Sequence, residues 1–277
     1  CINDVRNIKR FLIELFNFRE TDMVVLTDDA RDPQSQPTRA NIIRGMNWLV
    51  SDARPNDSFF FHFSGHGSQV KDTSGDEIDG YDETILPVDY KYAGQIVDDE
   101  MNAIMVRRLP QGARLTAIFD SCHSGTALDL PFVYDHRGRL VQNQVSELAT
   151  KSLMSAGGAY LSGDILTAGK SVFSGLKTMV SGTKIQKRQK DLKSTVGDVI
   201  MFSGCKDSQT SADTFNYVVG NTGAMSHAFV TVLRSNPRQT YTQLLHSTRE
   251  YLRRNKYKQV PQLSTGRHMD MNQVFIM

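Results

Sequence analysis

The order of apolar and polar residues along the chain predicts helices that alternate with short strands. Apolar residues recur at helical spacing in stretches that begin near residues 4, 38, 98, 223 and 241. Short apolar runs that indicate strands cover residues 23–26, 58–63, 84–88, 115–119 and 199–202, and a last run ends near residue 264. Strands in alternation with helices are typical of a mostly parallel sheet with helices on both faces. The predicted fold class is therefore α/β.

The ends of these elements carry local signals. Asn3 or Asp4 is expected to cap the first helix and Thr38 the second, because a short polar side chain can accept hydrogen bonds from the first free amides. Beyond Pro131 the pattern loosens. Residues 142–195 mix Ser, Gly and basic residues, which predicts an exposed, mobile connection.

One strand ends in a block of chemically active residues. Residues 114–125, RLTAIFDSCHSG, begin as a buried strand and break abruptly into polar residues around Cys122. In open parallel sheets, ligands and catalytic groups collect at the carboxyl ends of the strands, so Cys122 is placed as a nucleophile would be. A lone cysteine is more often a small buried hydrophobe. Polar neighbours that could lower the pKa of the thiol argue against that alternative here.

A second strand supplies a partner for the thiol. Residues 58–63, SFFFHF, are followed by SGHG at residues 64–67. An imidazole just beyond a strand end, with glycine on both sides, suits a general base for a nucleophile on the neighbouring strand. His66 is therefore the candidate base. His62 lies within the apolar run and is interpreted as a core histidine, or one that supports the site from behind.

Composition sets the class of protein. The 277 residues are 39% hydrophobic and 22% charged, as expected for a soluble globular enzyme of one large or two small domains. No apolar run reaches about 18 residues and no signal-peptide pattern opens the chain, so we expect no membrane or secretory role. We expect a cytoplasmic protein, with the nucleus as an alternative. The three well-separated cysteines form no disulfide or zinc pattern.

Charge is distributed unevenly, although the net charge is only +2. Residues 72–100 are rich in acids, and residues 170–193 are rich in Lys and Arg. A solvated face is the ordinary interpretation of either run. The acidic run also contains candidate metal ligands, which are considered below.

These motifs resemble a known family. HFSGHG at residues 62–67 and DSCHSG at residues 120–125 are similar to the His and Cys motifs of type I metacaspases, the caspase-like cysteine proteases of fungi, plants and protozoa. Further stretches resemble the same family, above all its fungal members: CINDV, GYDETILPVD, IVDDEM, LDLP and SGCKDSQTSAD. The resemblance runs across nearly the whole chain.

The resemblance implies a single caspase-like domain over residues 1–277. Residues 1–140 would form the large, p20-like part, residues 141–195 a basic mobile linker, and residues 196–277 the small, p10-like part. Resembling metacaspases carry a strand before the position of Cys1. We therefore expect the sheet of this chain to lack that first, inner strand.

The resemblance also implies proteolysis. Cys122 would attack the peptide carbonyl, while His66 would activate the thiol and then protonate the departing amine. The amides of Gly67 and Cys122 would stabilise the oxyanion. Three alternatives stay open: a catalytically silent scaffold or protein-quality-control module, a calcium-binding regulatory module, and a redox-sensing thiol protein. Hydrolysis of a fluorogenic Arg peptide that iodoacetamide blocks would separate them.

Two carboxylates are expected to set the specificity. Residues two apart on a strand point to the same side, so Asp120 should lie beside the nucleophile and Ser64 beside the base. Cys1 and Asp4 match the remaining substrate-pocket positions of the resembling family. Two carboxylates would bind an Arg or Lys side chain and repel an acidic one, so the expected partner is a protein or peptide with Arg or Lys before the scissile bond, not a nucleic acid. The alternative role for Asp120 is a helix cap or an orienter of the loop.

Four acids match the calcium positions of the resembling family: Asp82, Asp98, Asp99 and Asp129. Hard oxygen ligands suit Ca²⁺ better than zinc. Asp98 and Asp99 begin a helix, where a favourable interaction with the helix dipole is the alternative explanation. We expect a monomer whose activity rises with calcium.

An enzyme that prefers basic residues and carries an exposed basic segment is expected to process itself. A solvated loop or a nucleic-acid patch is the alternative interpretation of this segment. Its candidate residues are Lys184, Lys187, Arg188, Lys190 and Lys193.

Overall fold

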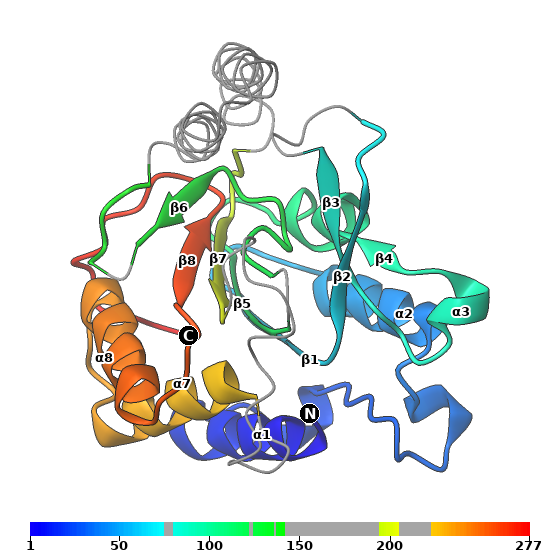
Figure 1. The fold of residues 1–277 in the computed structure, drawn as a ribbon, viewed down its shortest axis with the longest axis horizontal. Helices are drawn as coiled ribbons and strands as arrows, with labels where there is room; N and C mark the ends of the chain where they lie inside the picture. Colours follow the sequence, from blue (N-terminus) through cyan, green and yellow to red (C-terminus); the bar gives the residue numbers. More distant parts are fainter. Residues whose placement is uncertain (75–79, 122–123, 136, 142–193, 205–222) are drawn as a thin grey trace, which may run out of the picture.

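A five-stranded sheet forms the centre of the molecule. The computed structural model describes residues 1–74, 80–121, 124–135, 137–141, 194–204 and 223–277. The strand order is β1-β5-β7-β8-β6. The strands are β1 (Ser58–Ser64), β5 (Arg114–Asp120), β6 (Phe132–Tyr134), β7 (Asp198–Ser203) and β8 (Gln262–Thr265) (Figure 1). The linker predicted over residues 141–195 lies almost wholly outside the described residues.

Three neighbouring strands of the sheet, β1, β5 and β7, run parallel to one another. β1 pairs with β5 and β5 pairs with β7 in parallel, whereas β8 runs antiparallel to both β7 and β6. The predicted mostly parallel α/β sheet is therefore confirmed, with an antiparallel addition at one side. Strands from residues 1–140 and from residues 196–277 share this one sheet.

Helices cover both faces of the sheet because successive strand residues point to opposite sides. On β5, Ile118 packs into one apolar cluster, and Leu115 and Phe119 pack into the other. The first face carries α1 (Ile2–Phe16), α7 (Ala224–Ser235) and α8 (Tyr241–Arg254), with α1 and α7 side by side (Figure 1). The second face carries α2 (Arg39–Val50) and α4 (Asp98–Met101), which continues as the π-helical turn η3 (Asn102–Val106).

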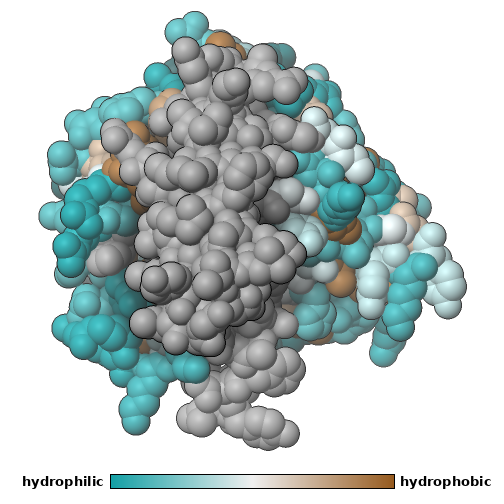
Figure 2. Space-filling view, turned by 45° about the horizontal axis from the view of Figure 1, so that its top comes forward, coloured by the Kyte–Doolittle hydropathy of each residue, from teal (hydrophilic) through white to brown (hydrophobic). Residues whose placement is uncertain are grey.

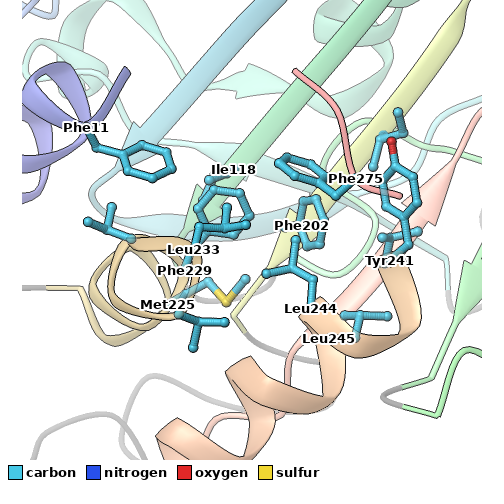
Figure 3. Packing of buried hydrophobic residues seen from close by; sticks show 14 of the residues in the cluster. Phe11, Ile118, Phe202, Met225, Phe229, Leu233, Tyr241, Leu244, Leu245 and Phe275 are labelled. Atoms are coloured by element: carbon cyan, nitrogen blue, oxygen red, sulfur yellow. The ribbon is translucent and has the colours of Figure 1, made fainter. Parts of the chain in front are cut away.

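Aromatic rings tie the first face together. The ring of Phe229 on α7 contacts Phe11 on α1, Phe202 on β7 and Phe275 near the end of the chain, all edge to face (Figure 3). Each such contact contributes about 0.5–1.5 kcal/mol beyond simple burial. This packing fixes α7 against the sheet, and with it the amides at the start of α7.

A small antiparallel sheet follows the candidate base. It contains β2 (Gly67–Lys71), β3 (Tyr81–Ile85) and β4 (Ile96–Val97), and the short helix α3 (Tyr90–Ala93) connects the last two. The strand expected at residues 84–88 is therefore displaced toward the amino terminus. β2 was not predicted, because GSQVK contains a single apolar residue. β6 was not predicted either, since the pattern loosens beyond Pro131.

Residues 23–26 do not form the predicted strand. Met23 is extended and packs against the first cluster, while Leu26 packs against the second, as strand residues three positions apart would. A strand also needs a hydrogen-bonded partner, and none of the described strands pairs with this segment. Among the described strands β1 pairs only with β5, so it forms an edge of the sheet. The 3₁₀ turns η1 (Glu20–Asp22) and η2 (Pro33–Ser35) flank the extended segment.

The predicted helix caps had different outcomes. The Thr38 side chain accepts the amide hydrogen of Asn41, which confirms it as the cap of α2. The prediction for α1 was wrong, because α1 begins at Ile2 and places Asp4 inside its first turn. Asp4 is only 1% exposed, and its carboxylate contacts other elements instead.

One face of the molecule shows mainly polar side chains among the described residues. On the face in Figure 2, hydrophilic side chains dominate and apolar ones are scattered in small groups. Within the described part of the chain, no helix has the length and apolar character needed to span a bilayer.

Candidate active site

The two strands that carry the predicted catalytic motifs end side by side. Ser64 at the end of β1 is the register partner of Asp120 at the end of β5, and the Gly65 amide donates a hydrogen bond to the Asp120 carbonyl at 3.4 Å. Two positions further along the chain, His66 is exposed. Cys122, two positions after Asp120, lies outside the described residues. The geometry between the base and the nucleophile therefore stays a prediction from sequence.

The loop after β1 is held in place by backbone contacts. The His66 carbonyl accepts a hydrogen bond from the Leu86 amide at 3.0 Å, and Gly67 begins β2 opposite Ile85. These contacts link the base to the small sheet. The Gly67 amide stays the predicted oxyanion donor, and its partner, the Cys122 amide, lies outside the described residues.

The predicted specificity residues are brought together. Asp4, from the first turn of α1, and Asp120, from β5, are both buried, and we call them the carboxylate pair. Ser64 Oγ donates to Asp4 Oδ2 at 2.6 Å, and the Gly223 amide donates to the same oxygen at 2.8 Å. The α-amino group of the exposed Cys1 lies 3.1 Å from that oxygen. All four predicted residues thus lie at the carboxyl ends of the two strands.

The start of α7 completes the surroundings of the carboxylate pair. The Ser226 amide donates to Asp120 Oδ2 at 2.7 Å. A Cβ on Gly223 would overlap Asp120 Oδ2 and lie 2.9 Å from Oδ1, so this position has room for glycine alone. The alternative interpretation of Asp120 as a helix cap is partly correct, because its carboxylate accepts an amide of the first turn of α7 from a distant strand. Sequence reasoning missed Gly223 and Ser226 because these contacts use backbone amides.

The electrostatics of the pair favour a cationic ligand. Burial raises the pKa of Asp120 to about 6, and the Asp4 charge adds to this rise against the opposing hydrogen bond from the Ser226 amide. Asp4 Oδ1 is buried and has no hydrogen-bond partner among the described residues. No described Arg or Lys side chain forms an ion pair with Asp4 or Asp120. A buried carboxylate without a complete set of partners is costly, and a cation would relieve that cost.

A second acidic group lies near the small sheet. Asp98 at the start of α4, Glu83 on β3 and Asp129 are all buried, and we call them the three-carboxylate cluster. Burial, and then the charges of Glu83 and Asp129, hold the pKa of Asp98 well above its usual range. The Asp98 oxygens accept the amide hydrogens of Glu83 and Asp99. Sequence reasoning had missed Glu83, which lies within the quoted GYDETILPVD motif.

The predicted calcium ligands are only partly brought together. The structure places Asp98 near Asp129, whereas Asp82 precedes Glu83 on β3, so those two side chains point to opposite faces. Asp99 is half-buried beside Asp98. The donor set consists of carboxylate oxygens, which fits a hard divalent cation. No three His, Cys, Asp or Glu side chains in the described ranges are arranged to hold a metal ion.

Side-chain contacts link the three-carboxylate cluster to the segment after the nucleophile. Glu83 accepts hydrogen bonds from Gln69 on β2 at 3.0 Å and from Thr126 at 2.6 Å. Asp129 has a positive φ of 51°. A change in the position of these carboxylates would therefore shift Thr126, in the segment that follows Cys122.

Comparison with known proteins gives consistent matches. Residues 1–131 match the family described as "Metacaspase, peptidase C14 domain". The whole chain is 52% identical to Metacaspase-1 of Coccidioides immitis, 51% to Metacaspase-1B of Neurospora crassa and 52% to Metacaspase-1A of Aspergillus fumigatus. It spans 60%, 65% and 67% of these relatives' lengths, respectively. A solved structure from Geobacter sulfurreducens is 25% identical, with a TM-score of 0.48 over 87% of this chain and 78% of that one.

Proposed function

Since this chain belongs to the metacaspase family, we propose that it is a cysteine endopeptidase that cleaves peptide bonds after Arg or Lys. The observation that carries this proposal is the buried carboxylate pair at the strand ends that lead to His66 and Cys122. Asp4 and Asp120 have no basic side chain as a partner among the described residues, so the substrate would supply the cation.

The proposed reaction has two steps. The Cys122 thiolate attacks the scissile carbonyl carbon, the C–N bond breaks, and His66 donates a proton to the departing amine. Water activated by His66 then attacks the thioester, which releases the carboxylic acid and regenerates the thiol. The Gly67 amide is the proposed donor to the oxyanion in both steps.

Specificity follows from the arrangement of the pair. Oδ2 of each carboxylate is bound by an amide from the start of α7, while Asp4 Oδ1 has no partner in the part of the chain that the structure describes. A guanidinium can donate to two carboxylates at once, whereas an ammonium acts as a point charge, so Arg is preferred over Lys. An acidic side chain is repelled.

Fluorogenic peptides that end in Arg, Lys or Asp test the proposal. The parent protein should cleave the Arg peptide fastest, then the Lys peptide, and leave the Asp peptide intact. Iodoacetamide or Cys122→Ala should abolish cleavage, while circular dichroism shows an unchanged fold. Efficient cleavage of the Asp peptide with the Arg peptide left intact would overturn the specificity, and turnover by Cys122→Ala within tenfold of the parent would overturn the nucleophile.

We also propose that Ca²⁺ activates the enzyme. Asp82, Asp98, Asp99 and Asp129 are the proposed ligands, and Glu83 is a further buried oxygen donor beside Asp98. A bound cation would neutralise repulsion among these groups and order the segment after the nucleophile. Calorimetric titration of Cys122→Ala, which cannot process itself, should show Ca²⁺ binding that Mg²⁺ does not reproduce. Full activity of the parent in excess EGTA would contradict calcium dependence.

Self-processing is proposed from sequence alone, because the basic segment lies outside the described residues. Cleavage after one or more of its basic residues should follow addition of calcium to the parent and not to Cys122→Ala. Intact-mass spectrometry of both proteins measures this directly. Identical masses after treatment would rule the proposal out. The candidate positions are Lys184, Lys187, Arg188, Lys190 and Lys193.

A further inference from the structure

We infer that His62 and Ser226 are positioning residues, which hold the Asp120 carboxylate in the orientation that selects a cationic side chain. The inference rests on the proposed preference for Arg and Lys, and it gives His62 a role beyond filling the core. His62 Nε2 lies 2.9 Å from Ser226 Oγ, and the Ser226 amide lies 2.7 Å from Asp120 Oδ2. Hydrogen bonds thus link the three residues in series, from β1 through α7 to β5.

Strand register makes this chain of contacts possible. His62 is the register partner of Ile118, which lies two residues before Asp120 on β5. The side chains of His62 and Asp120 therefore both point to the face that carries α1 and α7. Ser226 lies in the first turn of α7 on that same face. The contacts link residues 164 and 106 positions apart in sequence, so they depend on the whole fold.

The protons carried by His62 and Ser226 indicate which group donates in each contact. Loss of solvation lowers the pKa of His62 to about 4, so at neutral pH the ring is uncharged and only one of its nitrogens carries a proton. The Ser226 hydroxyl has one proton, and its interaction with Asp120 favours the ionised carboxylate. The consistent arrangement has His62 Nε2–H donating to Ser226 Oγ and Ser226 O–H donating to Asp120. Ser226 thus binds the carboxylate through its amide, and its hydroxyl helps to keep the pKa of Asp120 from rising further.

The result is a fixed orientation for both acids. α7 binds Oδ2 of Asp120 through Ser226 and Oδ2 of Asp4 through Gly223. Asp4 Oδ1 has no hydrogen-bond partner among the described residues, so this oxygen is left for a ligand. Two carboxylates held in this way match the fork of a guanidinium better than the single charge of an ammonium, so loss of the His62–Ser226 contact should reduce the preference for Arg over Lys.

Substitutions separate this role from simple packing. Ser226→Ala keeps the amide but removes the hydroxyl, and His62→Leu removes the donor to that hydroxyl. Either should lower kcat/KM for the Arg peptide roughly tenfold, mostly through KM, and reduce the ratio of Arg to Lys cleavage. His62→Gln restores a donor and Ser226→Thr keeps the hydroxyl, so both should recover most of the loss. Thr116→Val is the matched control, because Thr116 is a buried residue on the same face of β5 whose hydroxyl has no partner among the described residues.

Alkylation of Cys122 provides the closing experiment. The rate with an arginyl chloromethyl ketone is divided by the rate with iodoacetamide, for the parent and for each variant whose melting curve stays cooperative. A high ratio in the parent that falls in Ser226→Ala and His62→Leu, but not in Thr116→Val, supports the inference. A high ratio that both variants retain overturns the positioning role alone. A parent ratio near that of an uncharged chloromethyl ketone overturns the proposed specificity, and the positioning role with it.

Discussion

The buried acids of the carboxylate pair and of the three-carboxylate cluster differ in their hydrogen bonds and in their charged neighbours. In the pair, Asp120 faces one other carboxylate and accepts the amide of Ser226 at the positive end of α7. In the three-carboxylate cluster, Asp98 accepts hydrogen bonds from two amides, yet it faces two other carboxylates, Glu83 and Asp129. Asp120 and Asp98 are both almost fully buried, so burial alone does not explain why the pKa of Asp98 is raised further than that of Asp120.

The number of neighbouring charges distinguishes the two sites. The pKa of Asp120 is raised only to about 6, so its carboxylate is ionised at neutral pH and can bind a singly charged side chain. Asp98 faces two further acids, Glu83 and Asp129, whose charges add to the effect of burial and hold its pKa well above its usual range. The comparison agrees with the two proposed roles, which are substrate recognition for the pair and divalent cation binding for the three-carboxylate cluster.

Removing both charges from the pair should have the largest effect. Asp4→Asn combined with Asp120→Asn keeps the side-chain shapes but removes both anions, and each charged hydrogen bond contributes about 1.5–3 kcal/mol. We expect kcat/KM for the Arg peptide to fall by about 1,000-fold, equivalent to about 4 kcal/mol. The rate of alkylation by iodoacetamide should stay unchanged. Retention of Arg cleavage within tenfold of the parent would exclude the pair as the specificity site.

Gly223→Ala should disrupt the pair sterically. The added Cβ would overlap the Asp120 carboxylate, and forced overpacking of this kind costs about 3 kcal/mol of unfolding free energy. Urea denaturation measures the loss. Gly45→Ala on α2 is the matched control, because its Cβ would meet only Val24 Cγ1 at an ordinary 3.7 Å and should stabilise the helix by up to about 1 kcal/mol. Equal stability of the two variants would contradict the close approach of α7.

The pH dependence of stability should report Asp120. Its pKa is raised to about 6 in the folded state from about 4 in the unfolded state, so its stabilising contribution is complete below pH 4 and is lost as pH rises through 6. The ionised carboxylate therefore costs on the order of 2–3 kcal/mol at pH 7. Asp120→Asn should be more stable than the parent at pH 7 and no more stable at pH 4. A constant difference between these pH values would contradict the raised pKa.

Asp98→Asn should have the smallest effect, confined to calcium. Loss of one charged ligand should weaken Ca²⁺ binding about tenfold or more, while the ratio of Arg to Lys cleavage at saturating Ca²⁺ stays that of the parent. Calorimetry measures the affinity, and the peptide assay measures the ratio. A change in the ratio alone would mean that the two acidic sites are not separate. Asp22→Asn, at an exposed site on η1, is a matched control for loss of one acidic charge.

Local patterns predicted the elements that depend on neighbouring residues. The apolar runs located β1, β5 and β7, and Thr38 was correctly predicted to cap α2. Residues 23–26 have the same kind of pattern but pair with none of the described strands, because pairing depends on a distant partner. β2 has little apolar character, and its partner β3 determines its position.

The candidate site shows the same limit. Asp4, Ser64 and Asp120 could be proposed from motifs and strand spacing, and the structure brings them together. Gly223 and Ser226 could not, because their amides come from a helix more than a hundred residues away along the chain. The helix itself was predicted near residue 223, so its first amides were the available signal.

The order of strands in the sheet has a consequence for a cleaved chain. β7 and β8, from the carboxyl-terminal part, lie between β5 and β6, which precede the basic segment. A cut within residues 142–193 would therefore leave two fragments that interleave through the β5–β7 and β6–β8 pairings. Neither fragment could leave without opening both pairings and the ring contact between Phe11 on α1 and Phe229 on α7. The nicked protein would persist as a non-covalent heterodimer, and separation of its chains would be as slow as unfolding.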